Sequence, residues 1–120
     1  MVVLVTGRPG SGKTHYAYAL AKEYAKKDIP AAVIDGDEVR SETNNRDFTD
    51  EGRVRHLSRI AEMAAAFEGH GIIAIVAVVA PKREWRDSMR ARWRDNRLIY
   101  LPEGTLWVNT QYEVPADDEF

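Results

Sequence analysis

Eight consecutive residues near the N-terminus have the types and spacing of a phosphate-binding loop. They match the pattern G-x-x-x-x-G-K-[ST] and read Gly7, Arg8, Pro9, Gly10, Ser11, Gly12, Lys13 and Thr14. Glycines let the backbone turn so that amide groups point at phosphate oxygens, and a helix that begins near Gly12 adds its positive end. In this pattern the lysine reaches the β- and γ-phosphates of a nucleotide, and the threonine offers a hydroxyl to Mg²⁺. We therefore predict nucleotide binding at residues 7–14; the alternative is a glycine-rich connection without a ligand.

Two carboxylates, Asp35 and Asp37, follow the second apolar run of the chain and flank Gly36. In an open α/β sheet, ligands bind at the carboxyl ends of the strands. Phosphoryl transfer needs an acid that handles the metal and a group that orients or deprotonates the acceptor. Asp35 and Asp37 are the candidates for these tasks, on a tight turn that Gly36 permits. The alternative is a turn with a helix N-cap, where Asp is common.

The elements expected around these residues alternate between strand and helix. Short apolar runs predict strands at residues 1–6, 31–34 and 72–79, with weaker candidates at 98–101 and 105–108. Helices are expected at residues 15–27, at 50–69, where apolar residues recur every three or four positions, and from 81 to about 96. Residues 42–47 are predicted as a polar loop, and the acidic tail after Val114 as loose chain. The alternation predicts one domain over residues 1–120, an α/β fold with a parallel sheet sandwiched by helices.

Composition excludes several classes of protein. The 17 basic residues nearly balance the 19 acidic ones, for a net charge of −2, so charge alone does not recruit nucleic acid or a membrane. The chain has no cysteine, which excludes disulfides, thiolate metal sites and thiol nucleophiles and leads us to expect a cytoplasmic protein. The longest apolar run, residues 72–80, has nine residues, whereas a membrane span needs about 20.

Several motifs, in the same order, resemble those of the adenylylsulfate (APS) kinases. Residues 10–14 match the family's G-S-G-K-[ST], and residues 35–40 (DGDEVR) are similar to its D-G-D-N-x-R. Residues 48–59 resemble G-F-S-x-x-D-R-x-x-N-I-R-R, residues 79–81 resemble I-S-P, and residues 83–90 resemble Y-R-x-x-R-D-x-x-R. The likeness extends over roughly residues 1–95 in register, and residues 111–115 (QYEVP) add a tail motif similar to P-Y-E-x-P.

The resemblance implies a minimal P-loop NTPase fold, of the nucleoside-monophosphate-kinase-like type, and a phosphotransferase that uses ATP and Mg²⁺. The γ-phosphate would move to a hydroxyl of a small nucleotide-like acceptor, adenylylsulfate in the first interpretation. Lys13, Asp35 and Asp37 would be catalytic, with Thr14 and Asp35 on the metal. The implied acceptor-binding residues are Asp37, Arg40, Phe48, Arg53 and His56, where the arginines hold the phosphosulfate and the phenylalanine stacks on adenine. The alternatives are that Phe48 is a core anchor and that Arg53 lies on a solvated helix face.

The sequence differs from the family pattern in three respects. His56 stands where the family has Asn, and Ala80 replaces the Ser of I-S-P. Only residues 102–110 lie between the expected strand at 98–101 and the tail motif, so we expect the family's basic lid to be absent.

Two other functions stay open. The helix after Pro81 is rich in arginine, and Arg83, Arg86, Arg90 and Arg94 would share one face. That face can bind phosphates or an oligonucleotide, so a nucleic-acid 5′-hydroxyl is an alternative acceptor; the plainer interpretation is a solvated helix paired with its own acids. A nucleotide-binding protein without catalysis is the other alternative.

The expected partners are a nucleotide and a small phosphate acceptor, with no membrane. The sequence has three tryptophans, Trp85, Trp93 and Trp107, which we expect in the core or an interface rather than stacked on bases. The small sheet also leads us to expect a homodimer, because a small domain has a limited core of its own.

Overall fold

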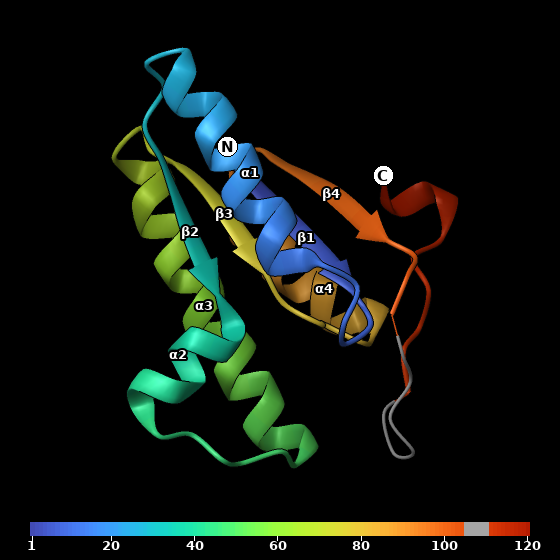
Figure 1. Ribbon diagram of the computed structural model, residues 1–120. Helices are drawn as coiled ribbons and strands as arrows, with labels where there is room; N and C mark the ends of the chain where they lie inside the picture. Colours follow the sequence, from blue (N-terminus) through green and yellow to red (C-terminus); the bar gives the residue numbers. More distant parts are fainter. Residues whose placement is uncertain (105–110) are drawn as a thin grey trace.

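Four parallel strands and the helices between them make up most of the chain in the computed structural model, which describes residues 1–104 and 111–120. The elements are β1 (Val2–Gly7), α1 (Lys13–Lys26), β2 (Ala31–Asp35), α2 (Gly36–Thr43), α3 (Asp50–Gly69), β3 (Ile73–Ala77), α4 (Arg83–Arg90), β4 (Asn96–Leu101) and a short 3₁₀ turn, η1 (Asp117–Glu119). The strand order is β2-β3-β1-β4, and every pairing is parallel (Figure 1). The predicted parallel sheet is therefore confirmed. Within the described residues, no helix combines the length and the apolar character needed to span a bilayer.

Helices cover both faces of the sheet, because β1 and β3 are apolar on both sides. Alternate side chains of a strand point to opposite faces, so Val2 and Leu4 pack with Ile60 of α3, while Val3 and Val5 pack on the side of α1. Figure 1 shows α1 on one face of the sheet and α3 and α4 on the other. Because all four strands run parallel, their carboxyl ends lie at one edge of the sheet.

Two expected boundaries are wrong. The helix after Pro81 ends at Arg90 rather than near Asn96, because Asn96 already pairs with Val2 as the first residue of β4. The expected polar loop at 42–47 begins later, since α2 continues to Thr43. The predicted strand at 105–108 and Trp107 lie outside the described residues.

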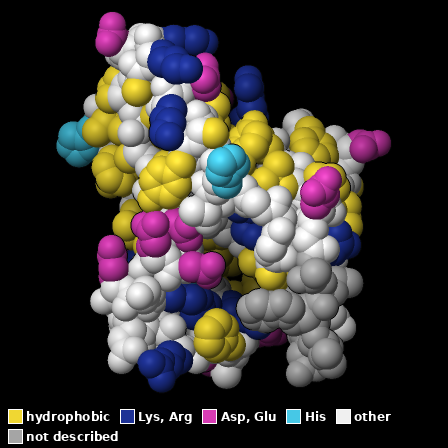
Figure 2. Space-filling model, viewed as in Figure 1, with side chains coloured by type: hydrophobic (Ala, Val, Ile, Leu, Met, Phe, Trp, Pro, Cys, Tyr) yellow, Lys and Arg dark blue, Asp and Glu magenta, His cyan; other side chains and the backbone are white. Residues whose placement is uncertain are grey.

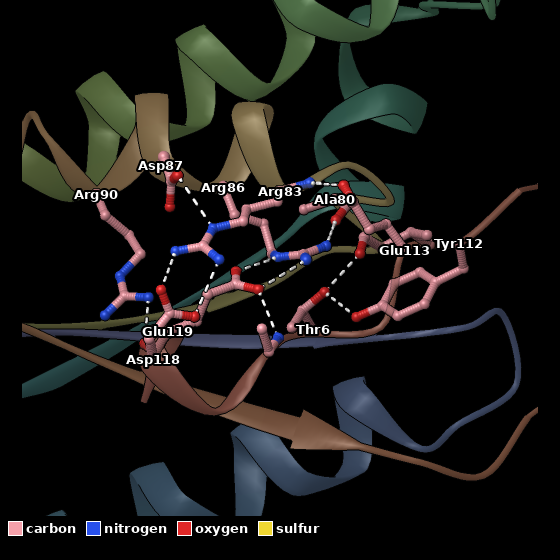
Figure 3. A network of polar contacts seen from close by, with 12 residues as sticks. Thr6, Ala80, Arg83, Arg86, Asp87, Arg90, Tyr112, Glu113, Asp118 and Glu119 are labelled. Carbon is pink, nitrogen blue, oxygen red and sulfur yellow. Dashed lines mark hydrogen bonds and ion pairs between the residues drawn. The ribbon is translucent and has the colours of Figure 1, made fainter.

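The acidic tail is not loose. Residues 111–120, which we call the C-terminal segment, run beside the end of β4 and along α4 (Figures 1 and 3). Glu119 is buried and its carboxylate accepts two hydrogen bonds from the buried guanidinium of Arg86, at 2.9 and 3.2 Å. A buried guanidinium requires a counter-ion, and the acids of the tail supply it.

The arginine-rich helix pairs with its own acids only in part: Arg83 lies 3.5 Å from Asp87 of the same helix, but its other acidic partners come from the C-terminal segment. Arg83 donates two hydrogen bonds to Asp118, and Arg90 donates to the backbone oxygen of Glu119. Arg94 lies beyond the end of α4, so the predicted helical face of four arginines is wrong. Instead, α4 presents arginines to the C-terminal segment.

Candidate functional site

The phosphate loop joins β1 to α1 in the conformation that its glycines permit. Gly10 and Gly12 have φ values of 79° and 90°, in the left-handed region that other residues rarely adopt. Gly12 is also the N-cap of α1, which has no side-chain cap and no acidic residue in its first turn. The first amides and the positive end of α1 therefore face an open position where an anion is stabilised.

Lys13 lies across this loop. Its ammonium donates hydrogen bonds to the carbonyl oxygens of Gly7 and Arg8, at 3.1 and 3.0 Å. Burial lowers the pKa of Lys13, while the nearby charges of Asp37 and Asp35 act to raise it. The ammonium is thus partly desolvated and, within the described residues, bonded only to neutral oxygens of the backbone and Ser11. A negatively charged phosphate would bind it more strongly than these neutral oxygens do.

Asp35 connects the loop to α2. Its Oδ2 accepts a hydrogen bond from the Thr14 hydroxyl at 2.6 Å, and its Oδ1 accepts one from the Asp37 amide at 2.9 Å. The side chain is therefore the N-cap of α2, which was the alternative interpretation, and at the same time a neighbour of the loop. Its metal-binding and catalytic role stays a prediction.

The pair of oxygens at Thr14 and Asp35 fits Mg²⁺, which prefers oxygen ligands and is commonly held by one or two protein groups together with phosphates and water. In the part of the chain that the structure describes, no cluster of three or more His, Cys, Asp or Glu side chains is arranged to hold a metal. A magnesium ion at Thr14 and Asp35 would therefore complete its shell with nucleotide oxygens and water.

Asp37 lies in the first turn of α2, with its side chain exposed on the wall of the same cavity. Within residues 1–104 and 111–120 its carboxylate has no hydrogen-bond or ion-pair partner, so it can accept a proton from a ligand. Gly36 begins α2 rather than forming an isolated tight turn. A β-carbon there would lie 2.9 Å from Val78 Cγ1, so glycine allows α2 to approach the end of β3.

A cavity of about 560 Å³ joins the loop to α2 and α3. Figure 2 shows basic and acidic side chains along a hollow of this face. The cavity is lined by eleven of the predicted site residues: Pro9, Gly10, Gly12, Lys13, Thr14, Asp35, Asp37, Arg40, Phe48, Arg53 and His56. Gly7, Arg8 and Ser11 belong to the loop but do not line the cavity.

The far end of the cavity combines an aromatic ring with two cations. The Phe48 side chain is 59% exposed, so the alternative of a core anchor is wrong. The Arg40 guanidinium lies 4.5 Å from the centre of that ring, and it also donates to the Asp47 carbonyl. Arg53 lines the same cavity, and burial, followed by the charge of Arg53, lowers the pKa of Arg40. Such a pair attracts an anion with several oxygens.

His56 is a neutral group in this wall. It is 5% exposed, and burial, followed by the positive charge of Arg40, lowers its pKa from 6.5 to about 4. Its Nδ1 is buried without a hydrogen-bond partner in the described residues. An uncharged imidazole with one free nitrogen can donate or accept a hydrogen bond but adds no charge near neutral pH.

The connection after β3, to which sequence analysis assigned no role in the site, forms the third wall of the cavity. Residues 77–81 and Trp85 line it. Ala80 has a φ of 42°, a conformation that costs energy for any residue with a β-carbon, and its carbonyl accepts a hydrogen bond from Arg86 at 2.8 Å. The only signal for this wall was its likeness to the I-S-P motif, while the position of Arg86 could not be read from the sequence.

Comparison with curated proteins finds the same family along the chain. A family model described as adenylylsulphate kinase matches residues 1–119. The adenylyl-sulfate kinase of Phocaeicola vulgatus is 41% identical over 93 residues, which cover 77% of this chain and 45% of that protein. The probable adenylyl-sulfate kinase of Aeropyrum pernix is 41% identical over 102 residues, 84% of this chain and 56% of that protein. The chain spans about half the length of the curated relatives it matches.

Solved structures agree with the family model. The APS kinase of Mycobacterium tuberculosis in complex with AMPPNP and APS aligns with a TM-score of 0.77 and 28% identity, over 83% of this chain and 61% of that one. A hexameric APS kinase from Thiobacillus denitrificans aligns with a TM-score of 0.80 and 29% identity, over 95% of this chain and 23% of that one. The fold is that of the P-loop NTPases, as predicted. With the phosphate loop, the paired aspartates and a matching family model over residues 1–119, the chain belongs to the adenylylsulphate kinase family.

Proposed function

We propose that this chain transfers the γ-phosphate of ATP to a hydroxyl of adenylylsulfate. The observation that carries the proposal is the single cavity that has the phosphate loop at one end and the Arg40–Phe48 pair at the other. A donor and an acceptor nucleotide need two such ends, because each has phosphate oxygens and a base to bind. The relative from Mycobacterium tuberculosis, which was solved with AMPPNP and APS, supports the same pairing of ligands.

The residues at the loop end hold and polarise the phosphoryl donor. Loop amides and Lys13 contact the β- and γ-phosphates, and Thr14 with Asp35 would hold Mg²⁺, which when bound neutralises charge on the phosphate oxygens. Asp37 orients the acceptor hydroxyl and takes its proton. As the acceptor oxygen bonds to the γ-phosphorus, the bond from that phosphorus to the bridging oxygen breaks, and ADP leaves.

The residues at the other end select the acceptor. Arg40 and Arg53 would bind the phosphosulfate, and the exposed face of Phe48 would stack on adenine. His56 would line this end with an uncharged ring, where the family pattern has an amide side chain.

The test is a coupled assay of ADP release with ATP, Mg²⁺ and adenylylsulfate. Asp37→Asn should lower kcat by about 10²- to 10⁴-fold, the usual contribution of a general base. The matched control is Glu38→Gln, which neutralises the neighbouring carboxylate that accepts a hydrogen bond from the exposed Tyr18. No turnover with adenylylsulfate in the unmodified protein, despite ATP binding, would remove this acceptor.

The structure does not favour the alternative acceptor, a nucleic-acid 5′-hydroxyl. Arg83 and Arg86, on the helix that would attract it, are engaged by Asp118 and Glu119 of the same chain. Transfer of labelled phosphate to 5′-hydroxyl oligonucleotides would still restore that alternative, and ATP binding without any transfer would restore the non-catalytic one. A cytoplasmic location, expected from the absence of cysteine, stays a prediction. So does a homodimer, which a sedimentation mass equal to one chain would exclude.

A further inference from the structure

The outer side of the phosphate loop contacts residues from much later in the chain. Arg8 does not line the cavity; its Nη1 donates to the Tyr100 hydroxyl at 3.2 Å, and its guanidinium carbon lies 5.4 Å from the centre of the Tyr112 ring. The rings of Tyr100 and Tyr112 are stacked, with centroids 6.0 Å apart. The side chain of the second loop residue is therefore held between an aromatic pair and the loop itself.

Tyr112 also contacts Thr6, the residue that directly precedes the loop. The hydroxyl oxygens of Tyr112 and Thr6 lie 2.9 Å apart, and Thr6 donates to the Val79 carbonyl at 2.5 Å. Since the only hydroxyl proton of Thr6 is used there, Tyr112 is the donor in the first bond. Thr6 thus bonds both to Tyr112 of the C-terminal segment and to the wall of the cavity that follows β3.

The chain just after β4 packs directly against the loop as well. A β-carbon on Gly104 would lie 2.8 Å from the Pro9 carbonyl oxygen and 3.1 Å from the Ser11 amide nitrogen. Gly104 also has a φ of 127°, so both its conformation and its surroundings require glycine. Together with Tyr112, it fixes the side of the loop that faces away from the ligand.

The C-terminal segment is itself well anchored, as Figure 3 shows. The Arg86–Glu119 ion pair is buried, and the Glu113 amide donates to the Pro81 carbonyl at 2.6 Å. The Arg86 guanidinium also lies 5.7 Å from the centre of the Tyr112 ring, so the ring packs against a buried cation. Tyr112 therefore has fixed partners on the side away from the loop.

We infer that Tyr112 is a positioning residue for the phosphate loop, holding Thr6 and Arg8 so that the loop amides are already arranged before nucleotide binds. The inference rests on the proposed use of this loop for nucleotide binding. A glycine-rich loop has many accessible conformations, and a free loop must lose them on binding, which weakens affinity. A nucleotide that binds only one loop conformation gains affinity in proportion to the population of that conformation.

Calorimetric titration with AMPPNP and Mg²⁺ tests the inference on the full chain. Tyr112→Phe keeps the ring beside Arg8 but loses the bond to Thr6, so it should weaken binding about threefold. Tyr112→Leu loses both contacts and should weaken it about tenfold. In a chain that already carries Arg8→Met, adding Tyr112→Leu should weaken AMPPNP binding by clearly less than tenfold. The reason is that the contact between Arg8 and Tyr112 is already absent in that background.

Two controls separate positioning from general stability. Asp118→Asn removes an exposed ion pair of the same segment that makes no contact with the loop, and it should bind AMPPNP like the unmodified chain. Amide hydrogen exchange at residues 7–14 should be faster in the Tyr112 variants without nucleotide, while exchange in β3 is unchanged. Unfolding midpoints confirm that each variant is folded at the temperature of the titration.

The outcomes are distinguishable. Folded Tyr112 variants that bind AMPPNP as tightly as the unmodified chain, or an equal loss in Asp118→Asn, would overturn the inference. An unmodified chain that binds no nucleotide would overturn the proposed function instead. The exchange rates of the loop amides would then still test the positioning role, since that measurement needs no ligand.

Discussion

Replacing Glu119 by glutamine removes one charge from the ion pair that joins α4 to the C-terminal segment. Both side chains are withdrawn from water, with Arg86 0% and Glu119 1% exposed, and the carboxylate accepts from Nε and Nη2 of Arg86. Glutamine has nearly the same shape, so packing is retained. The guanidinium is left buried without its counter-ion.

The loss in the free energy of unfolding should be large compared with the total stability of a domain of this size. Breaking one side of a buried ion pair typically costs about 3–5 kcal/mol, whereas domains are stable by about 5–15 kcal/mol in total. With a urea dependence of about 1–3 kcal/mol per molar, the unfolding midpoint should fall by roughly 2 M. Urea titrations at pH 7, followed by tryptophan fluorescence, measure this shift.

The same pair gives a pH dependence with a definite sign. Burial acts to raise the pKa of Glu119, but the hydrogen bonds from Arg86 and the Ala116 amide, together with the Arg86 charge, hold it below the ordinary 4.5. A carboxyl group with a lowered pKa in the folded state stabilises the fold above its unfolded pKa, and this contribution is lost as the pH falls through the folded value. The difference between the unmodified chain and Glu119→Gln should therefore shrink below about pH 4.5.

Two further variants show whether charge is the cause. Replacing both partners, with Arg86→Met and Glu119→Leu together, should recover most of the loss, because a buried pair exchanged for apolar residues is often neutral in stability. Asp118→Asn, in the exposed pair with Arg83, should leave the midpoint close to that of the unmodified chain. An unchanged midpoint in Glu119→Gln at pH 7 would refute the burial of this pair.

Three other predictions concern the cavity. Phe48→Ala should weaken adenylylsulfate binding about tenfold, the usual worth of one stacked base, and should leave the unfolding midpoint unchanged because the ring is 59% exposed; an unchanged affinity in calorimetry would contradict stacking. Lys13→Met should reduce ADP release by at least about 100-fold, since a cation that stabilises the transferred phosphoryl group is lost, and full activity would exclude that role. With its pKa lowered to about 4, His56 takes up its proton more readily in the unfolded chain, so stability should fall as the pH drops from 6.5 towards 4. Urea titrations of His56→Gln, which lacks this contribution, should show a flatter dependence over that range, and equal slopes would contradict it.

Local sequence was sufficient to predict structure and chemistry where both depend on one short segment of the chain. The phosphate loop follows from eight residues, because glycine conformations and the start of a helix are set by neighbours in the chain. The parallel sheet follows from apolar runs that alternate with helical ones. Asp35 and Asp37 reach the correct edge of the sheet for the same reason: Asp35 ends β2 and Asp37 follows it in the first turn of α2.

Sequence reasoning failed where the partner of a residue is far along the chain. The tail was predicted to be loose and the arginines of α4 to be solvated, since neither segment shows an apolar pattern of its own. The structure places Glu119 against Arg86, 33 residues away, and Tyr112 against Thr6, 106 residues away. The chemical type of each side chain was visible in the sequence, but its burial was not, because burial depends on which surfaces meet when the sheet and its helices assemble.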